Sequence, residues 1–398
     1  MTAASAVDYP IYDADHHYYE PPEAFLRHLP KKYREDFQYA EVNGRTKLIV
    51  GGILSNYIPN PTFNVVAGVG SQEKWYRGDN PQGLTLREFA GEPVPSEAAF
   101  HNGAAHLKLM DQEGIHAAIV LPTLASIIEE RLPHKPETIQ AMMHSLNMWV
   151  ADEYGFGNGR QFPTGAINLS DVDVACQELD FLLKAGARSV LIRPAPVAGI
   201  RGSRSHGFKE FDPFWARVNE AKIFVIHHVS DSGYDKIYQW WTAGGKGEFR
   251  PFEKDPFGEI LDWMGRPIAD SLAALVCHGV FDRFPDVRVA VLENGSAWLE
   301  PLLKRMESTY HKMPKSFTRD PVETFRKHVF LAPFYEDPVD KVVELMGANR
   351  VLFGSDWPHP EGLAHPRDFF KDLEGISPEN QKLIMSTNLK DLLEGKRD

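Results

Sequence analysis

Short apolar runs alternate with longer segments of helical periodicity from about residue 110 onward. Seven runs have the length and composition of buried strands, namely 117–121, 164–169, 189–193, 223–227, 287–293, 328–332 and 351–354. An earlier run, 11–15, raises the number to eight. Between the runs, apolar residues recur at the spacing of helices in 171–184, 268–281, 296–311 and 338–346. The pattern predicts βαβ units and an α/β fold, a single (β/α)8 TIM barrel spanning residues 1–398.

Two stretches interrupt this alternation. Residues 20–103 are rich in Pro, Gly and Asn and separate the first two strands by far more than one helix, so we interpret them as an insertion at the mouth of the barrel. Its aromatic residues either line a pocket or form a small separate core; they include Tyr57, Phe63, Trp75, Tyr76 and Phe89. The second stretch, 229–266, follows the fifth strand and carries Tyr234, Tyr238, Trp240 and Trp241.

Composition, net charge and cysteine content argue against several classes of protein. The chain has 398 residues, 43% of them hydrophobic and 25% charged, as in ordinary globular proteins. A net charge of -12 provides no extended basic face, so we expect no nucleic-acid partner. Cys176 and Cys277 each lie in a segment interpreted as a buried helix, which leaves neither a disulfide framework nor a cysteine metal site. Without a leader-like segment or an apolar run of ~18 residues, we expect a cytoplasmic protein with no membrane partner.

The first strand ends in Asp13-Ala14-Asp15-His16-His17. Because side chains alternate along a strand, Asp15 and His17 project to one side and His16 points away. A carboxylate and an imidazole at this spacing suit a divalent ion that accepts mixed oxygen and nitrogen ligands, such as zinc or manganese. Taken alone the motif is weak, since polar residues are common just after a strand.

Two further strand ends carry candidate ligands. The apolar fifth strand runs into His227-His228, of which we favour His227 as the ligand and interpret the other as a hydrogen-bonded core histidine. The eighth strand delivers Asp356, which could instead cap a following helix. Prolines at 358 and 360 indicate that a loop intervenes, which weakens the capping alternative. Barrel geometry brings these strand ends around one opening, so the sequence predicts one ion bound by Asp15, His17, His227 and Asp356.

Four motifs in this order resemble the amidohydrolase-related family, whose members include aminocarboxymuconate semialdehyde decarboxylase and gamma-resorcylate decarboxylase. The motifs are Asp13 to His17 with Glu20-Pro21, Met110 to Ile115, Gly279 to Pro285, and Gly354 to His359. The similarity runs from about residue 10 to residue 394. It implies a TIM barrel with a metal bound by the first-strand pair, the fifth-strand histidine and the eighth-strand aspartate.

The chain departs from these decarboxylases on the sixth strand, where they carry a catalytic histidine and this sequence has Glu293. We take Glu293 as the acid or base. Arg193, at the end of the fourth strand, is a candidate for holding a substrate carboxylate, with a structural salt bridge as the alternative. His359 is a candidate contact to substrate or to a ligand, whereas His278 is interpreted as a packed helix residue.

The leading hypothesis is therefore a metal-dependent lyase, a non-oxidative decarboxylase of a small carboxylated aromatic or unsaturated acid, that needs no organic cofactor. The alternative is a hydrolase of a lactone, ester or amide that uses a water molecule activated by the metal. A barrel that binds a ligand without catalysis is a third reading, disfavoured because Asp15, His17 and Asp356 are all present. A homodimer is an open alternative to a monomer.

Overall fold

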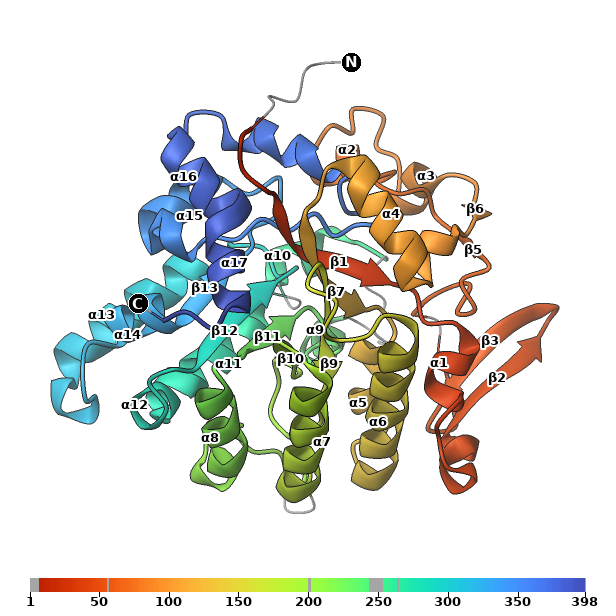
Figure 1. Ribbon diagram of the computed structural model, residues 1–398, viewed down its shortest axis with the longest axis horizontal. Helices are drawn as coiled ribbons and strands as arrows, with labels where there is room; N and C mark the ends of the chain where they lie inside the picture. Colours follow the sequence, from red (N-terminus) through yellow and green to blue (C-terminus); the bar gives the residue numbers. More distant parts are fainter. Residues whose placement is uncertain (1–6, 56, 200–201, 243–252, 263–264, 398) are drawn as a thin grey trace.

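The computed structural model describes residues 7–55, 57–199, 202–242, 253–262 and 265–397. Its main strands are parallel and pair in two series. The first series is β1 (Tyr12–Tyr18), β7 (Ala117–Pro122) and β8 (Gln161–Pro163). The second is β9 (Gly165–Ala166), β10 (Ser189–Leu191), β11 (Phe224–His228), β12 (Arg288–Leu292) and β13 (Val329–Leu331). The fold is thus of the mixed α/β type (Figure 1).

The end strands of the two series approach each other on both sides: β8 approaches β9, and β1 approaches β13 through a connecting segment. Only Thr164 separates β8 from β9 along the chain. The predicted strand 164–169 therefore corresponds to β9, which is shorter than predicted and directly follows β8. At the other margin, the segment 351–357 makes one parallel bridge from Val351 to Leu331 and another from Trp357 to His16. This segment therefore lies between β13 and β1, where the predicted eighth strand was expected.

Helices follow most of the strands along the chain, and α6, α7 and α8 lie side by side (Figure 1). The larger helices are α4 (Gly103–Glu113), α6 (Pro136–Glu153), α7 (Val172–Ala185), α8 (Asp212–Ala221), α11 (Arg266–Cys277), α13 (Leu299–Lys312), α14 (Pro321–His328) and α15 (Val339–Met346). Shorter ones are α5 (Ile128–Arg131), α9 (Asp235–Trp241), α10 (Pro256–Leu261), α12 (Val280–Arg283), α16 (Pro378–Lys382) and α17 (Asn388–Leu393). Their ends obey local chemistry: Asp171 accepts hydrogen bonds from two N–H groups that begin α7, and Gly186 ends it with φ 98°.

Two of the sequence predictions for this region are wrong in detail. The segment 268–281 is not one helix, because Gly279 takes φ 67° and separates α11 from α12. Cys277, expected inside a buried helix, is the exposed last residue of α11, whereas Cys176 is buried as expected. No helix in the described ranges is long and apolar enough to cross a membrane.

The strands bury both faces, and their alternation divides the core in two. Val225 and Val289 pack into the larger cluster, which also contains the apolar faces of helices, whereas Phe224, Ile226 and Leu292 pack into a second cluster. Helix α17 contributes Leu389, Leu392 and Leu393 to that second cluster. Strands buried on both faces show near-continuous apolar sequence, which is the pattern that identified them.

The stretch between β1 and β7 contains its own elements. They are α1 (Pro22–Leu26), α2 (Glu73–Tyr76), α3 (Leu86–Ala90), the antiparallel sheet of β2 (Phe37–Val42), β3 (Arg45–Val50) and β4 (Ile53–Ser55), and the pair β5 (Val65–Val66) and β6 (Val94–Pro95). Short 3-10 turns complete it. The second irregular stretch, 229–266, falls partly outside the described residues, at 243–252 and 263–264.

Candidate functional site

The carboxyl ends of three strand segments converge on one cluster of nitrogen and oxygen atoms. Strand β1 supplies Asp15 and His17, β11 supplies His228, and Glu293 follows directly after β12. Their ligand atoms lie within 4.8 Å of one another. A second group meeting the same limit combines His17 and Glu293 with two residues of the 351–359 segment, Asp356 and His359.

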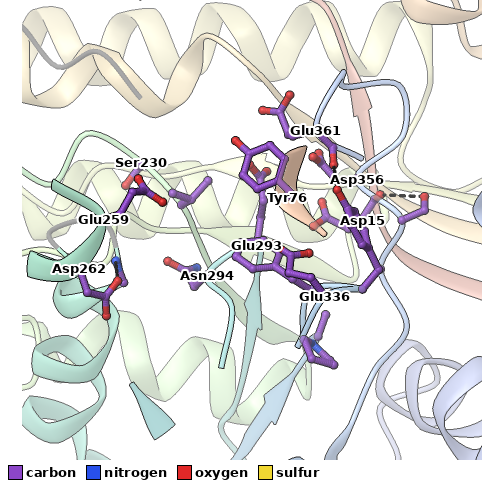
Figure 2. A pocket seen from close by; sticks show the side chains of 18 of the residues that line it. Asp15, Tyr76, Ser230, Glu259, Asp262, Glu293, Asn294, Glu336, Asp356 and Glu361 are labelled. Atoms are coloured by element: carbon purple, nitrogen blue, oxygen red, sulfur yellow. Dashed lines mark hydrogen bonds between the residues drawn. The ribbon is translucent and has the colours of Figure 1, made fainter. Parts of the chain in front are cut away.

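Distances within the cluster are those of ligands that would share an ion. His17 Nε2 lies 3.1 Å from Asp15 Oδ1, 3.4 Å from Asp356 Oδ1 and 3.5 Å from Glu293 Oε2. His228 Nε2 lies 3.0 Å from Glu293 Oε2 and 3.4 Å from Asp15 Oδ1. All of these side chains are largely buried. Asp15, Glu293 and Asp356 face one cavity (Figure 2).

The structure thus brings together Asp15, His17, Asp356, Glu293 and His359 from the predicted set. Asp356 caps no helix, since the next helical segment begins at Pro366 with His365 before it. Gly354 allows this approach, because a Cβ there would lie 2.9 Å from the Cβ of Asp15.

The structure brings His228, and not the predicted His227, into the cluster. The His227 ring lies on the other face of β11, with Nδ1 3.2 Å from the Ile192 carbonyl and Nε2 3.3 Å from Ser271 Oγ. Burial lowers its pKa to about 4, as for a neutral core histidine. Because side chains alternate along a strand, a one-residue error moves the imidazole to the wrong face. His228 lies on the same face of β11 as Phe224 and Ile226. The sequence alone does not show which of two adjacent histidines faces the site.

The Arg193 guanidinium is bonded to other protein groups and does not reach into the cluster. Its Nη1 donates to Glu130 Oε2 at 2.8 Å and to the Asp231 carbonyl at 3.2 Å, and its Nε lies 3.8 Å from Glu129. The structural salt bridge, left open as an alternative, is therefore the observed arrangement. These partners come from α5 and from the loop that follows β11, which are remote from Arg193 in sequence.

His359 bridges two elements at the edge of the cluster. Its Nδ1 lies 2.6 Å from Asp356 Oδ1 and its Nε2 lies 3.1 Å from Thr123 Oγ1, just after β7. The ring also packs against that of His17, with centroids 4.0 Å apart. His359 is thus placed to orient Asp356. His278, in contrast, contacts Ser205 Oγ at 2.8 Å, consistent with a packing role.

Glu293 and Asp356 share a backbone feature that pattern analysis missed. Both adopt left-handed conformations, with φ 51° and φ 56°, which non-glycine residues rarely do. Such conformations cost energy, and they gather at sites where the surrounding structure enforces a functional geometry. Each follows the end of an extended segment, so the turn aims its carboxylate at the cluster.

Charge in the cluster is unbalanced. Burial alone would lower the pKa of His228, but the carboxylates of Glu293 and Asp15 outweigh it and raise the pKa to about 10. Burial, followed by repulsion from Glu293 and Glu361, raises the pKa of Asp356 well above its ordinary value. Several carboxylates facing few positive groups are the electrostatic setting that a bound cation relieves.

A cavity of about 220 Å³ opens beside the cluster. Aromatic residues form part of its wall, namely Tyr57, Tyr76, Phe334 and Tyr335. Acidic residues that the sequence analysis did not single out also line it, including Glu259, Asp262, Glu336 and Glu361 (Figure 2). Of the two earlier alternatives for the aromatic residues of 20–103, lining a pocket is observed for Tyr57 and Tyr76. Phe63 instead stacks on Tyr19, with centroids 4.5 Å apart, and both belong to the larger hydrophobic cluster and not to a separate small core.

Comparison with known proteins gives the chain its relatives. Residues 74–393 match the sequence model of the family described as Amidohydrolase. The crystal structure of amidohydrolase map2389c from Mycobacterium avium subsp. paratuberculosis K-10 is 37% identical, with a TM-score of 0.90, over 98% of this chain and 100% of that one.

Two more distant relatives have named activities. Gamma-resorcylate decarboxylase of Rhodococcus jostii (strain RHA1) is 24% identical over 298 residues, 71% of this chain and 84% of the relative. The crystal structure of dihydroxybenzoic acid decarboxylase from Polaromonas sp. JS666, with bound manganese and the inhibitor 2-nitroresorcinol, has a TM-score of 0.54 and 20% identity over 82% of this chain and 94% of that one. The second likeness concerns the fold.

Proposed function

Because the chain belongs to the amidohydrolase family, we propose that it is a metal-dependent enzyme that decarboxylates a small aromatic or unsaturated carboxylic acid without an oxidant. One divalent ion is held by Asp15, His17, His228 and Asp356. The observation that carries this proposal is the convergence of two imidazoles and several buried carboxylates from separate strand ends beside one cavity. The named activities of its relatives supply the reaction.

The donor set fits such an ion. Two imidazoles and two carboxylates give the mixed nitrogen and oxygen shell that zinc and manganese accept, and the related Polaromonas structure holds manganese. His228 Nε2 and Glu293 Oε2 are buried without a well-formed hydrogen bond, although 3.0 Å separates them. Buried polar atoms rarely remain unsatisfied, so His228 Nε2 is suited to bind the ion and Glu293 Oε2 to exchange a proton with a bound substrate.

The ion and the residues around the cavity have separate roles in the proposed reaction. When bound, the ion supplies a Lewis acid that orients a carboxylate and a neighbouring oxygen. The aromatic wall of Tyr57, Tyr76 and Phe334 suits an unsaturated ring and excludes water from it. Loss of carbon dioxide leaves an electron pair on carbon that must take up a proton, and Glu293 lies at the cluster to deliver it. In this role Glu293 begins the step protonated.

Hydrolysis of a lactone, ester or amide is the second candidate, and one observation favours it. Burial would raise the pKa of Glu293, but His228 and His17 outweigh that effect and hold the pKa well below its usual range. An ionised carboxylate suits a general base that removes a proton from an attacking water molecule. The two candidates therefore differ in the protonation state that Glu293 must start from.

Incubation of the metal-loaded protein with aromatic carboxylic acids, with carbon dioxide as the measured product, tests the proposal. Release of an alcohol or amine without carbon dioxide would select hydrolysis. Glu293→Gln should lower the rate about 10²-fold or more under either reaction. Glu300→Gln should not, because Glu300 is a partly exposed residue of α13 that pairs with Lys304. Activity that falls as pH rises identifies Glu293 as the acid, and activity that falls as pH drops identifies it as the base.

We also propose that the two strand series form one closed (β/α)8 barrel within a single domain of residues 1–398. The bridges from 351–357 to β13 and to β1, and the single residue between β8 and β9, support closure. Residues 20–103 would then be an insertion between the first two barrel strands that contributes Tyr57 and Tyr76 to the cavity. This arrangement places the cluster at the carboxyl ends of the strands, where barrel enzymes carry their chemistry.

A further inference from the structure

Asp13 is a fully buried carboxylate that takes no place in the metal cluster. We propose that it is a positioning residue, which fixes the strand bearing Asp15 to the segment bearing Asp356. The inference rests on the metal site proposed above and deepens it, because it explains how two ligands from opposite ends of the chain reach one point.

The need for such a residue arises in β1. Its pairing with β7 changes register between Asp13 and His16: three residue steps on β1 match two steps on β7, from Ala118 to Val120. An extra residue of this kind is a β-bulge, which leaves backbone groups unpaired and redirects side chains, often beside active sites. Asp15 lies within the bulge.

Asp13 accepts hydrogen bonds from one backbone group inside the bulge and from one in the neighbouring segment 351–357. Its Oδ1 accepts a hydrogen bond from the Asp15 N–H at 3.0 Å and a second from the Ser355 N–H at 3.0 Å. One oxygen therefore contacts the backbone of a proposed ligand and the backbone next to another, Asp356. Neither bond depends on a bound ion.

The junction between β1 and 351–357 shows the same role. Ala14 N donates to the Phe353 carbonyl at 2.8 Å, and His17 N donates to the Trp357 carbonyl at 2.7 Å. Between these two backbone bonds lies the contact from Ser355 to Asp13. The Asp13 side chain thus takes the place of a backbone-to-backbone hydrogen bond between β1 and the segment 351–357.

A chain of buried histidines holds Asp13 itself. Its Oδ2 lies 3.1 Å from His16 Nε2, and His16 Nδ1 lies 3.1 Å from His106 Nε2 on α4. All three side chains are 0% exposed, so water does not compete for these contacts. His16 points away from the proposed ligands, as the alternation along β1 predicts, and into this network.

Zinc affinity of the metal-free protein, measured by competition with a chelator, tests the proposal. Asp13→Ala should weaken zinc binding by roughly 10- to 100-fold, the usual effect of groups that orient metal ligands. Asp13→Asn should bind zinc nearly as tightly as the native chain, because an amide oxygen accepts the same two N–H groups. Asp36→Ala is the matched control: it removes another buried carboxylate, which bonds Lys135 and Thr138, and should lower stability without changing zinc affinity.

Thermal unfolding of each metal-free variant separates misfolding from lost positioning. A folded Asp13→Ala protein with native zinc affinity overturns the proposal, and so does an Asp13→Asn protein as weak as Asp13→Ala. If Asp13→Ala does not fold, Asp13→Ser takes its place, since a hydroxyl on the shorter chain does not span both N–H groups; equal affinity of the Ser and Asn variants then overturns the proposal. A native chain that binds no zinc or manganese refutes the metal site itself, which is a different outcome.

Discussion

His228 lies between two carboxylates, with its Nε2 3.0 Å from Glu293 and 3.4 Å from Asp15. Their negative charge raises its pKa to about 10 against the effect of burial, so the imidazole carries a proton at neutral pH when no ion is bound. A metal ligand must be neutral imidazole. Proton and ion therefore compete for this one nitrogen.

Metal binding should release a proton from the protein below pH about 10, the raised value for His228. Affinity should rise as pH increases toward that value, because less work is then needed to deprotonate the ligand. Titration calorimetry in two buffers of different ionisation enthalpy measures the number of protons released. Identical heats in both buffers would show that His228 is already neutral.

Alanine substitution of the two adjacent histidines should affect different properties, metal affinity in one case and stability in the other. His228→Ala removes a proposed ligand and should weaken metal binding beyond the roughly 10- to 100-fold effect of outer partners. His227→Ala loses contacts to Ile192 and Ser271 and should cost about 1–3 kcal/mol of stability, the penalty of unsatisfied buried groups. Metal affinity and urea denaturation on the same samples decide the matter. Loss of metal from the His227 variant alone would restore the original assignment.

At the scale of elements, the strand ends that meet in the cluster could be predicted from the sequence more readily than the faces on which their side chains lie. Asp15, His17 and Asp356 could be predicted because each ends an apolar run, and parallel strands bring such ends together. The bulge in β1, the left-handed turn at Glu293 and the face of His228 depend on pairing register. Contacts between distant segments set that register, and no local pattern records them.

Arg193 illustrates a partner that only the fold reveals, since Glu130 of α5 meets it from 63 residues away. Both side chains are mostly buried, at 9% and 15% exposed. Arg193→Met should therefore destabilise the protein by about 1–3 kcal/mol, because Glu130 loses the more buried of its two cationic partners and keeps only the exposed Lys236. The double variant with Glu130→Gln should recover part of this loss in urea denaturation. Additive losses would show that the two groups are not coupled.

At the scale of the whole molecule, the proposed ion joins segments from both ends of the chain at the cavity, while the apolar core packs elsewhere. The two hydrophobic clusters join the strands to the helices through apolar contacts that need no ion. The fold should accordingly survive loss of the ion, unlike small domains that fold only around a metal. Packing and metal binding are separate contributions to stability in this arrangement.

Chelation should lower the unfolding temperature without abolishing the folded state. An ion present at 100 times its Kd stabilises the native state by about 2.7 kcal/mol. Calorimetry with and without chelator measures the shift, and circular dichroism at low temperature checks that secondary structure persists. A metal-free chain without secondary structure would mean that the core depends on the ion.

The left-handed backbone at Glu293 and Asp356 has an evolutionary consequence. Glycine adopts φ > 0 without steric cost and asparagine tolerates it better than most residues, whereas glutamate is strained there. In a lineage freed from selection for the reaction, mutation of Glu293 to glycine or asparagine would increase stability, whereas aspartate at 356 tolerates this conformation more readily. A descendant that keeps the glutamate therefore bears a mark of continuing selection, one that can be seen without knowing its substrate.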